Sequence, residues 1–269
     1  MMPPPVAAPD TPQGTPQDVA LIRGRYRARL AQGDADVQAA QALRWRAFRG
    51  GAAAGGAGSA GRDADGFDAR CRHLLVEDLA TGALAGCLRL MILPDGGAIG
   101  QSYSAQFYDL SALSAGRAPM VEIGRFCMRP GLQDADVLRL ALAAVTRAVD
   151  ACGAALLFGC SSFPGTDWQA HAAAFALLRA RHLARPERAP RIKAPEVIRF
   201  ADHPLPAEPP RAALAGLPPL LRSYLAMGGW VSDHAVIDRD LNTLHVFTGV
   251  DLAAIPPARA RLLRSMAAD

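Results

Sequence analysis

The segment from Met120 to Pro130, MVEIGRFCMRP, constrains the fold of this chain more than any other. It is apolar at both odd and even positions, as in a buried strand, yet it carries the carboxylate of Glu122 and the guanidinium of Arg125. Burying a charge without a partner is costly, so each of these side chains must be paired or must face a cleft. Because side chains alternate between the two faces of a strand, the two share a face only if the strand bulges near Gly124.

The flanking segments predict a fold of the α/β (α+β) class. Residues 73–78 and 83–93 are expected to pair as an antiparallel hairpin. Asp134 is expected to cap a long amphipathic helix, which leads to the almost wholly apolar segment 154–160. The succession of strand, helix and strand over residues 120–160 therefore predicts a βαβ crossover with a parallel pair. It lies inside a mixed, mostly antiparallel central sheet with helices on both faces.

The chain is expected to form a single domain. Residues 1–18 are rich in Pro, Thr, Gln and Ala and are predicted to be a disordered tail, so the domain spans residues 19–269. The Gly/Ala-rich segment 50–61 is predicted to be a mobile loop inside it. Asp167 is expected to cap a helix that runs to about residue 185, and residues 230–250 are interpreted as a terminal hairpin.

Composition limits the classes of function. The net charge is +4, only 6% of residues are aromatic, and no basic patch is interleaved with stacking residues, so no nucleic-acid partner is expected. The five cysteines are scattered without the CxxC spacing of a zinc site, which indicates a reduced, cytoplasmic protein that holds no metal. No run of about 18 uncharged apolar residues occurs, so no membrane-spanning helix is expected.

The order of the elements resembles the GNAT-type N-acyltransferase fold. Three local motifs are similar to those of acyl-homoserine lactone synthases, which take acyl chains from acyl carrier protein. The motifs are Asp65-Gly66-Phe67-Asp68, Gly86-Cys87-Leu88-Arg89-Leu90 and Glu122-Ile123-Gly124-Arg125-Phe126. The segment Arg46-Ala47-Phe48 looks like the Arg-x-Phe helix of the same synthases.

Beyond residue 130 the resemblance is to a second family. Segments 157–165, 216–221 and 235–243 resemble the ornithine–acyl-carrier-protein N-acyltransferases of bacterial ornithine lipid synthesis. This resemblance implies transfer of a 3-hydroxyacyl chain from acyl carrier protein to the α-amine of L-ornithine, which gives a lyso-ornithine lipid. It implies no cofactor, since the phosphopantetheine thioester of the carrier protein is a co-substrate.

The loop after Met128 agrees with a carrier-protein donor. GNAT enzymes that use acetyl-CoA have a glycine-rich loop there, and its amides bind the pyrophosphate at a helix N-terminus. Here residues 129–136, RPGLQDAD, contain one glycine, a proline without an amide hydrogen, and two aspartates that would repel a pyrophosphate.

Within this resemblance, Glu122 and Arg125 are the expected catalytic residues. Attack of an amine on a thioester requires a deprotonated amine, and Glu122 is the candidate general base, with a pKa that burial raises and Arg125 lowers. The alternative is a structural ion pair of Glu122 with Arg125 or Arg89. The two arginines are expected either to bind the carboxylate of the substrate or to hold the acidic pair Asp65 and Asp68 in a structural network.

Four further side chains are candidates for substrate binding. Asp65 and Asp68 could bind the cationic end of the amino acid, or could form a turn before a helix. Ser161 and Ser162 follow the apolar segment, at the expected end of a central strand, where ligand clefts open. Their hydroxyl or amide groups could serve the oxyanion or the pantetheine, or could serve only a turn.

A basic segment follows. Residues 166–193 carry six Arg or Lys against two acidic residues. Arg179, Arg181 and Arg185 are candidates for docking acyl carrier protein or an anionic membrane surface, which would place the protein at the periphery of the inner membrane. The alternative is a solvated helix face with arginines near its C-terminus.

Three other functions are kept as alternatives. The first is acyl-homoserine lactone synthesis from S-adenosylmethionine, and the second is acylation of another amino acid such as glutamine. The third is a non-catalytic module that binds acyl chains or membranes.

Overall fold

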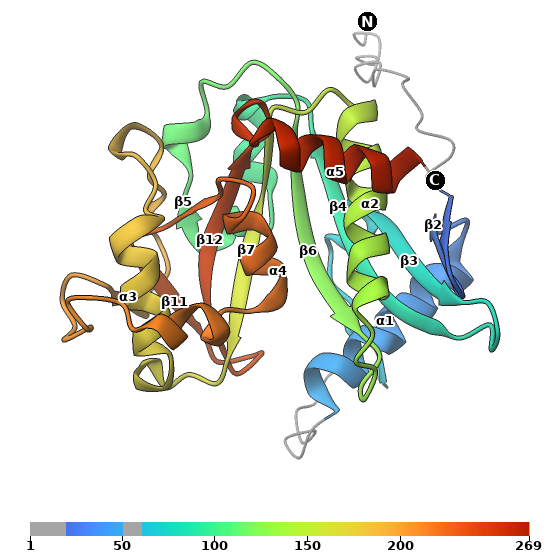
Figure 1. The fold of residues 1–269 in the computed structure, drawn as a ribbon, viewed down its shortest axis with the longest axis horizontal. Coiled ribbons are helices and arrows are strands. Elements are labelled where there is room, and N and C mark those ends of the chain that lie inside the picture. The colour runs from blue at the N-terminus through green and yellow to red at the C-terminus, as the bar shows by residue number, and fades with distance from the viewer. Residues whose placement is uncertain (1–19, 51–60, 269) are drawn as a thin grey trace, which may run out of the picture.

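The computed structural model describes residues 20–50 and 61–268, and one large sheet runs through the molecule (Figure 1). The sheet has ten strands in the order β1-β2-β3-β4-β6-β7-β12-β11-β9, with β10 beside β12. Their bounds are β1 Leu21–Arg23, β2 Tyr26–Leu30, β3 Arg72–Asp78, β4 Leu84–Leu93, β6 Met120–Met128, β7 Leu156–Pro164, β9 Val197–Arg199, β10 Trp230–Val231, β11 His234–Asp238 and β12 Thr243–Asp251. The predicted tail at 1–18 and most of the predicted loop at 50–61 lie outside the described residues.

The predicted crossover is confirmed. β6 and β7 pair in parallel through Met120–Glu122 and Leu156–Phe158, whereas the other pairs of the sheet are antiparallel. Helix α2, Ala135–Ala151, connects the two strands, and the side chain of Asp134 caps it by accepting a hydrogen bond from the backbone N–H of Asp136. The mixed sheet follows from this one connection, because a parallel pair needs a crossover long enough to cover a face.

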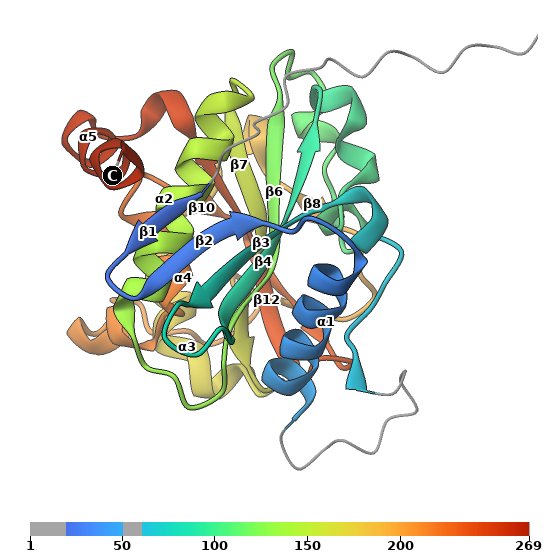
Figure 2. The same ribbon diagram turned by 90° about the vertical axis from the view of Figure 1, so that its right-hand side faces the viewer.

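Helices and loops cover both faces of the sheet, as expected. α2 packs on one face together with α4, Pro219–Leu225, and α5, Pro257–Ala268, and α3, Ala172–Arg181, covers the C-terminal part of that face. The opposite face carries α1, Asp34–Arg49, over β3, β4 and β6, as Figure 2 shows. Residues 94–119 cover the rest of it, and their short strand β5, Tyr108–Asp109, pairs with β8, Arg191–Ile192. We call these the helical face and the α1 face.

Two predicted boundaries are wrong. β7 does not end at residue 160 but continues to Pro164, because residues 160–164 pair with residues 243–247 of β12. Pairing with β12 therefore outweighs the tendency of Ser161 and Ser162 to form a turn. Asp167 does cap a turn, but α3 ends at Arg181 instead of near residue 185.

Within residues 20–50 and 61–268, every helix is too short or too polar to cross a lipid bilayer.

Candidate active site

The central strand β6 bulges where the sequence requires it. Arg89 of β4 lies opposite Gly124, and Cys87 lies opposite Cys127, so three steps along β6 match two steps along β4. The residue in the left-handed conformation is Arg125, at φ 54°, and not Gly124. A non-glycine residue pays roughly 1–2 kcal/mol for this conformation, which is typical of functional sites that their surroundings hold in place.

The bulge brings Glu122 and Arg125 to the same face. Before it, Ile123 packs on the helical face, and after it Phe126 takes that position. Both charged side chains therefore project to the α1 face, where each contacts Tyr103. The backbone N–H of Tyr103 donates to Glu122 at 2.8 Å, and the Tyr103 hydroxyl accepts from Arg125 at 3.1 Å. The guanidinium also lies 4.9 Å from the centre of the Tyr103 ring.

Glu122 is buried and hydrogen-bonded by the chain instead of ion-paired. It is 3% exposed and accepts hydrogen bonds from the backbone N–H groups of Tyr103 and Ser104 and from the Ser104 hydroxyl, the last at 2.6 Å. Burial raises the pKa of Glu122, although the hydrogen bonds from Ser104 and Tyr103 and the charge of Arg89 act against the rise. The expected alternative, an ion pair with Arg125 or Arg89, is wrong, since none of the ion pairs among the described residues includes Glu122.

Three arginines and three aspartates form one buried cluster beside Glu122. Its members are Arg44, Asp63, Asp65, Asp68, Arg89 and Arg125, and we call it the ion-pair cluster. Asp63 accepts from Arg44 and from Arg125 at 3.0 Å each, and Arg89 contacts both Asp65 and Asp68. The formal charges cancel, so the cluster keeps several charges inside the fold without a net buried charge. Arg89 and Arg125 therefore hold the acidic pair, one of the two roles expected for them.

Asp65 is where a ligand can reach the cluster. Its side chain is 27% exposed, against 11% for Arg125 and less than that for the other four members. Burial is the largest influence on the pKa of Asp65 and tends to raise it, but Arg89 and Arg125 together lower it below its ordinary value. Asp65 is thus an anion at neutral pH and can attract a cation.

The two candidate serines point to opposite faces. Ser161 is buried on the helical face and accepts a hydrogen bond from the Thr248 hydroxyl at 2.9 Å, so it lies away from Glu122. Ser162 is exposed on the α1 face. Cys160 also faces that side, with its sulfur 3.4 Å from the Ser104 hydroxyl, and burial raises the pKa of its thiol to about 12. A thiol so protonated is a poor nucleophile at neutral pH.

Strands β6 and β7 separate immediately beyond Glu122. Their pairing ends at Glu122 and Phe158, and Gly159 then approaches the Ile123 carbonyl so closely that a Cβ atom there would lie 2.2 Å from it. Past this point β6 remains paired with β4, and β7 with β12, so the two strands diverge (Figure 1).

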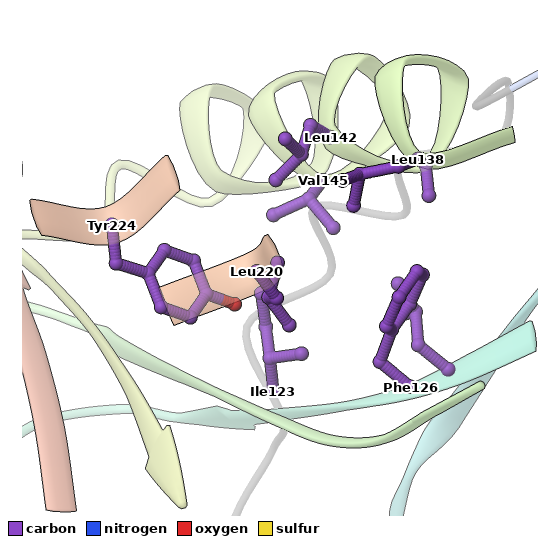
Figure 3. A pocket seen from close by; sticks show the side chains of 9 residues that line it. Ile123, Phe126, Leu138, Leu142, Val145, Leu220 and Tyr224 are labelled. Carbon is purple, nitrogen blue, oxygen red and sulfur yellow. The ribbon is translucent and has the colours of Figure 1, made fainter. Parts of the chain in front are cut away.

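An apolar crevice lies on the helical face near this point, between the sheet, α2 and α4 (Figure 3). Its lining is Leu88, Ile123, Phe126, Leu138, Ala141, Leu142, Val145, Leu220 and Tyr224. Because Ile123 directly follows Glu122 in β6, the crevice and the buried carboxylate lie on opposite sides of the same short segment of strand. An acyl chain on one side and an amine on the other could therefore meet where the strands part.

Comparison with known proteins agrees with this arrangement. Residues 43–143 match the family described as acetyltransferase (GNAT) domain. An L-ornithine N(alpha)-acyltransferase of Rhodobacter capsulatus is 31% identical, over 86% of this chain and 91% of the relative. A protein of the same name from Rhizobium meliloti is 34% identical, over 84% of this chain and 80% of the relative. The chain belongs to the L-ornithine N(alpha)-acyltransferase family.

The predicted fold and class of enzyme are thereby confirmed: this member of the L-ornithine N(alpha)-acyltransferase family is an acyltransferase with the GNAT fold. Among solved structures, FeeM, an N-acyl amino acid synthase from uncultured soil microbes, is 11% identical, with a TM-score of 0.47 over 85% of this chain and 93% of that one.

In this family member the three candidate docking arginines differ from one another in exposure and in their contacts. The guanidinium of Arg179 donates to the carbonyls of Phe200, Leu205 and Pro206, at 3.1–3.4 Å, so it holds the segment after β9. Arg181, the last residue of α3, and Arg185, which follows the helix, are exposed. Only the latter two have the accessibility that docking requires.

Sequence reasoning missed several residues of the site. Arg46, in the Arg-x-Phe segment, is exposed, whereas Arg44 is 1% exposed and belongs to the ion-pair cluster. The signal for Arg44 was present, because it follows Ala40 by four positions on the apolar stripe of α1, where a charge needs a buried partner. Tyr103 and Ser104 carried no local signal.

Proposed function

We propose that this acyltransferase transfers a 3-hydroxyacyl chain from acyl carrier protein to the α-amine of L-ornithine, as the first step of ornithine lipid synthesis. The observation that carries the proposal is the 31–34% identity, over most of both chains, to relatives named L-ornithine N(alpha)-acyltransferase. The residue roles below are part of this proposal.

Glu122 acts as the general base. The α-ammonium of ornithine must lose a proton before its nitrogen can attack, and a carboxylate with a raised pKa is suited to accept it. A carboxylate has about four acceptor sites. Oε1 of Glu122 accepts two hydrogen bonds, both from Ser104, but Oε2 accepts only the one from Tyr103 among the described residues. The remaining site on Oε2 takes the proton, directly or through a water.

The thioester approaches from the helical face. Its acyl chain enters the apolar crevice, and its carbonyl lies where β6 and β7 part, within reach of the amine on the other side. The edge of β6 that no longer pairs with β7 offers backbone N–H groups to the oxyanion that develops on the carbonyl. The nitrogen forms the new amide bond, the carbon–sulfur bond breaks, and the pantetheine thiolate takes up a proton.

The α1 face binds the amino acid. Asp65 receives the side-chain ammonium, and Arg125 receives the carboxylate, so the substrate exchanges its charges with the Asp65–Arg125 pair, whose nitrogen and oxygen lie 3.4 Å apart. Arg89 and Asp68 hold that pair in position, and Ser162 borders the same face. Ser161 has no place in this scheme.

The N-terminus of α2 supports a carrier-protein donor. Carboxylates of the chain occupy the N-cap and the first turn of α2. Asp134, at the N-cap, accepts a hydrogen bond from the Tyr26 hydroxyl, and Asp136, in the first turn, pairs with Arg23 and Arg139. These carboxylates repel the pyrophosphate of a CoA donor at the place where it would bind. Arg181 and Arg185 are then available to the acidic carrier protein, or to the anionic surface of the inner membrane from the cytoplasmic side.

The decisive experiment uses purified protein, ornithine and 3-hydroxytetradecanoyl-acyl carrier protein. We expect N-acyl-ornithine by mass spectrometry, and we expect its formation to be lost in the Glu122→Gln variant. Acylation of glutamine in preference to ornithine, or an acyl-homoserine lactone from S-adenosylmethionine, would overturn the substrate assignment. Loss of ornithine lipids from a deletion strain, restored by the wild-type gene alone, tests the same assignment in cells.

A further inference from the structure

We propose that Tyr224 recognises the 3-hydroxyl group of the acyl donor inside the apolar crevice. This inference rests on the proposed function, and it gives a physical basis for a preference for 3-hydroxyacyl over unsubstituted acyl chains.

The hydroxyl of Tyr224 is buried without a partner. The residue is 5% exposed, and its hydroxyl oxygen makes no hydrogen bond within residues 20–50 and 61–268. The chain has three other tyrosines, and each of their hydroxyls is satisfied: Tyr26 by Asp134, Tyr103 by Arg125, and Tyr108 by the carbonyl of His245. A buried hydroxyl left unpaired is rare in folded proteins and destabilising, so this one calls for a functional explanation.

The hydroxyl points into the crevice. In Figure 3 the Tyr224 ring extends from α4 with its oxygen directed toward Leu220 and Ile123. The other eight lining side chains are all aliphatic or aromatic hydrocarbons, so Tyr224 is the one polar side chain of this lining. A ligand that fits must be mostly apolar and carry one group that can donate or accept a hydrogen bond.

The position of Tyr224 matches the position of a 3-hydroxyl on a bound chain. In the proposed function the thioester carbonyl lies where β6 and β7 part, next to Ile123, and the carbon that carries the 3-hydroxyl is only two bonds from the carbonyl carbon. Tyr224 faces Ile123, so a hydroxyl near the start of the chain enters its vicinity, and the later methylenes extend toward Leu138 and Leu142. The gaps among the lining atoms amount to about 180 Å³, but none of them admits a water-sized sphere, so the lining side chains have to move apart before a segment of an acyl chain can enter.

Such a site discriminates through the cost of leaving Tyr224 unpaired. With a 3-hydroxyacyl chain, the hydroxyl of the donor leaves water and bonds to the Tyr224 hydroxyl, which is already buried. With an unsubstituted chain, the Tyr224 hydroxyl stays buried and unpaired, so the transition state with that donor gains nothing from it.

The test compares two chain-matched donors, 3-hydroxytetradecanoyl- and tetradecanoyl-acyl carrier protein, with ornithine as acceptor. We expect wild-type protein to favour the hydroxylated donor in kcat/KM by roughly tenfold or more, and the Tyr224→Phe variant to bring that ratio close to one. The matched control is Tyr26→Phe, which removes a buried hydroxyl far along the chain and should keep the wild-type ratio. Equal use of both donors by wild type, or an unchanged ratio in Tyr224→Phe, overturns the proposal.

A second measurement covers folding and separates this inference from the proposed function. Because the Tyr224 hydroxyl is unpaired, Tyr224→Phe should keep or raise the Tm, whereas Tyr26→Phe, which loses its bond to Asp134, should lower it. Equilibrium binding of the two acyl-pantetheine thioesters to wild type and Tyr224→Phe needs no ornithine. If ornithine is not acylated but Tyr224→Phe abolishes a preference for the hydroxylated thioester, the proposed function fails and the inference stands. If wild-type protein shows no such preference, the inference about Tyr224 is wrong, and the proposed function is unaffected.

Discussion

The two faces of β6 differ in the kind of side chain that gathers on them. On the α1 face, six charged side chains pair with one another, and Glu122 is fixed by three hydrogen bonds from Tyr103 and Ser104. On the helical face, an apolar crevice contains one tyrosine hydroxyl without a partner. The α1 face is organised by pairs within the chain, whereas the lining of the apolar crevice leaves the Tyr224 hydroxyl unpaired.

The difference suits the two substrates. In the proposed function, a small zwitterion exchanges charges with the ion-pair cluster, which needs rigid partners. A long acyl chain binds through apolar area, which needs little direction apart from one polar contact. The following changes test each face in turn, from the largest expected effect to the smallest.

Replacing Glu122 by Gln tests the chemistry proposed for the α1 face. Gln cannot accept the proton of the amine, and we expect kcat to fall by roughly 10²–10⁴-fold, as for loss of a general base. Single-turnover kinetics with acyl carrier protein donor measures the effect. Glu77→Gln, which breaks a pair with Arg27 and Arg29 on β3, is the control and should stay near wild type. A kcat within a few-fold of wild type in Glu122→Gln would leave Glu122 only the role of holding residues 103–104.

Removing Arg44 tests how much the ion-pair cluster on the α1 face contributes to stability. The variant Arg44→Ala leaves the carboxylates of Asp63 and Asp68 buried with one cation fewer, and the free energy of unfolding should fall by about 3–5 kcal/mol. Urea denaturation measures it. Arg239→Ala, which breaks an exposed pair with Glu196, should cause no measurable change. Equal effects of the two variants would show that the cluster is solvated and not a preorganised unit.

Filling the crevice tests whether the acyl chain binds on the helical face. Leu142→Trp places extra volume among its lining residues, so kcat/KM for a tetradecanoyl donor should fall by roughly tenfold, and less for a butyryl donor. Steady-state kinetics with both donors gives the comparison. Ala151→Trp, at an exposed position at the end of the same helix, serves as control. A fall that does not depend on chain length would move the acyl chain elsewhere.

The pH dependence reports on Glu122 directly. Burial raises its pKa above the ordinary 4.5, so the base is lost as pH falls through that raised value, and log kcat should decline there with a slope of about one. The opposite sign holds for stability. The folded state binds this proton more tightly than the unfolded chain, so the contribution is fully present below pH 4.5 and is lost as pH rises through the folded pKa. Both features should be absent in Glu122→Gln, and an acidic limb that persists in the variant would belong to another group.

The candidate docking residues Arg181 and Arg185 should give the smallest effect. The double variant Arg181→Glu/Arg185→Glu should raise the KM for acyl carrier protein by roughly three- to tenfold, with an effect that shrinks at high salt. The reversal Arg261→Glu/Arg264→Glu on α5, also at exposed positions, is the control. Equal effects of the two reversals would indicate a response to net charge and not a docking surface.

Local pattern determined much of the fold. The apolar run of β6, the Asp134 cap of α2 and the apolar start of β7 each come from neighbouring residues, and they were enough to predict the crossover. The condition for Glu122 and Arg125 to share a face also followed from the alternation of a strand alone.

Contacts between distant segments decided the rest. Arg125, and not Gly124, takes the left-handed conformation, because Asp63 and Asp65, about 60 positions earlier in the chain, bind its guanidinium there. Ser104 meets Glu122 only because residues 94–119 fold back over the sheet.

The same physical reason explains Tyr224. A short helix of ordinary composition gives no sign that one hydroxyl will be left unpaired, since that depends on the sheet and on α2 packing around it. Sequence by itself determined which strand carries Glu122 and Arg125. Only the tertiary structure decided which of its polar groups are satisfied and which, like the Tyr224 hydroxyl, are left unpaired, because hydrogen-bond partners are set by packing between elements and not by their order along the chain.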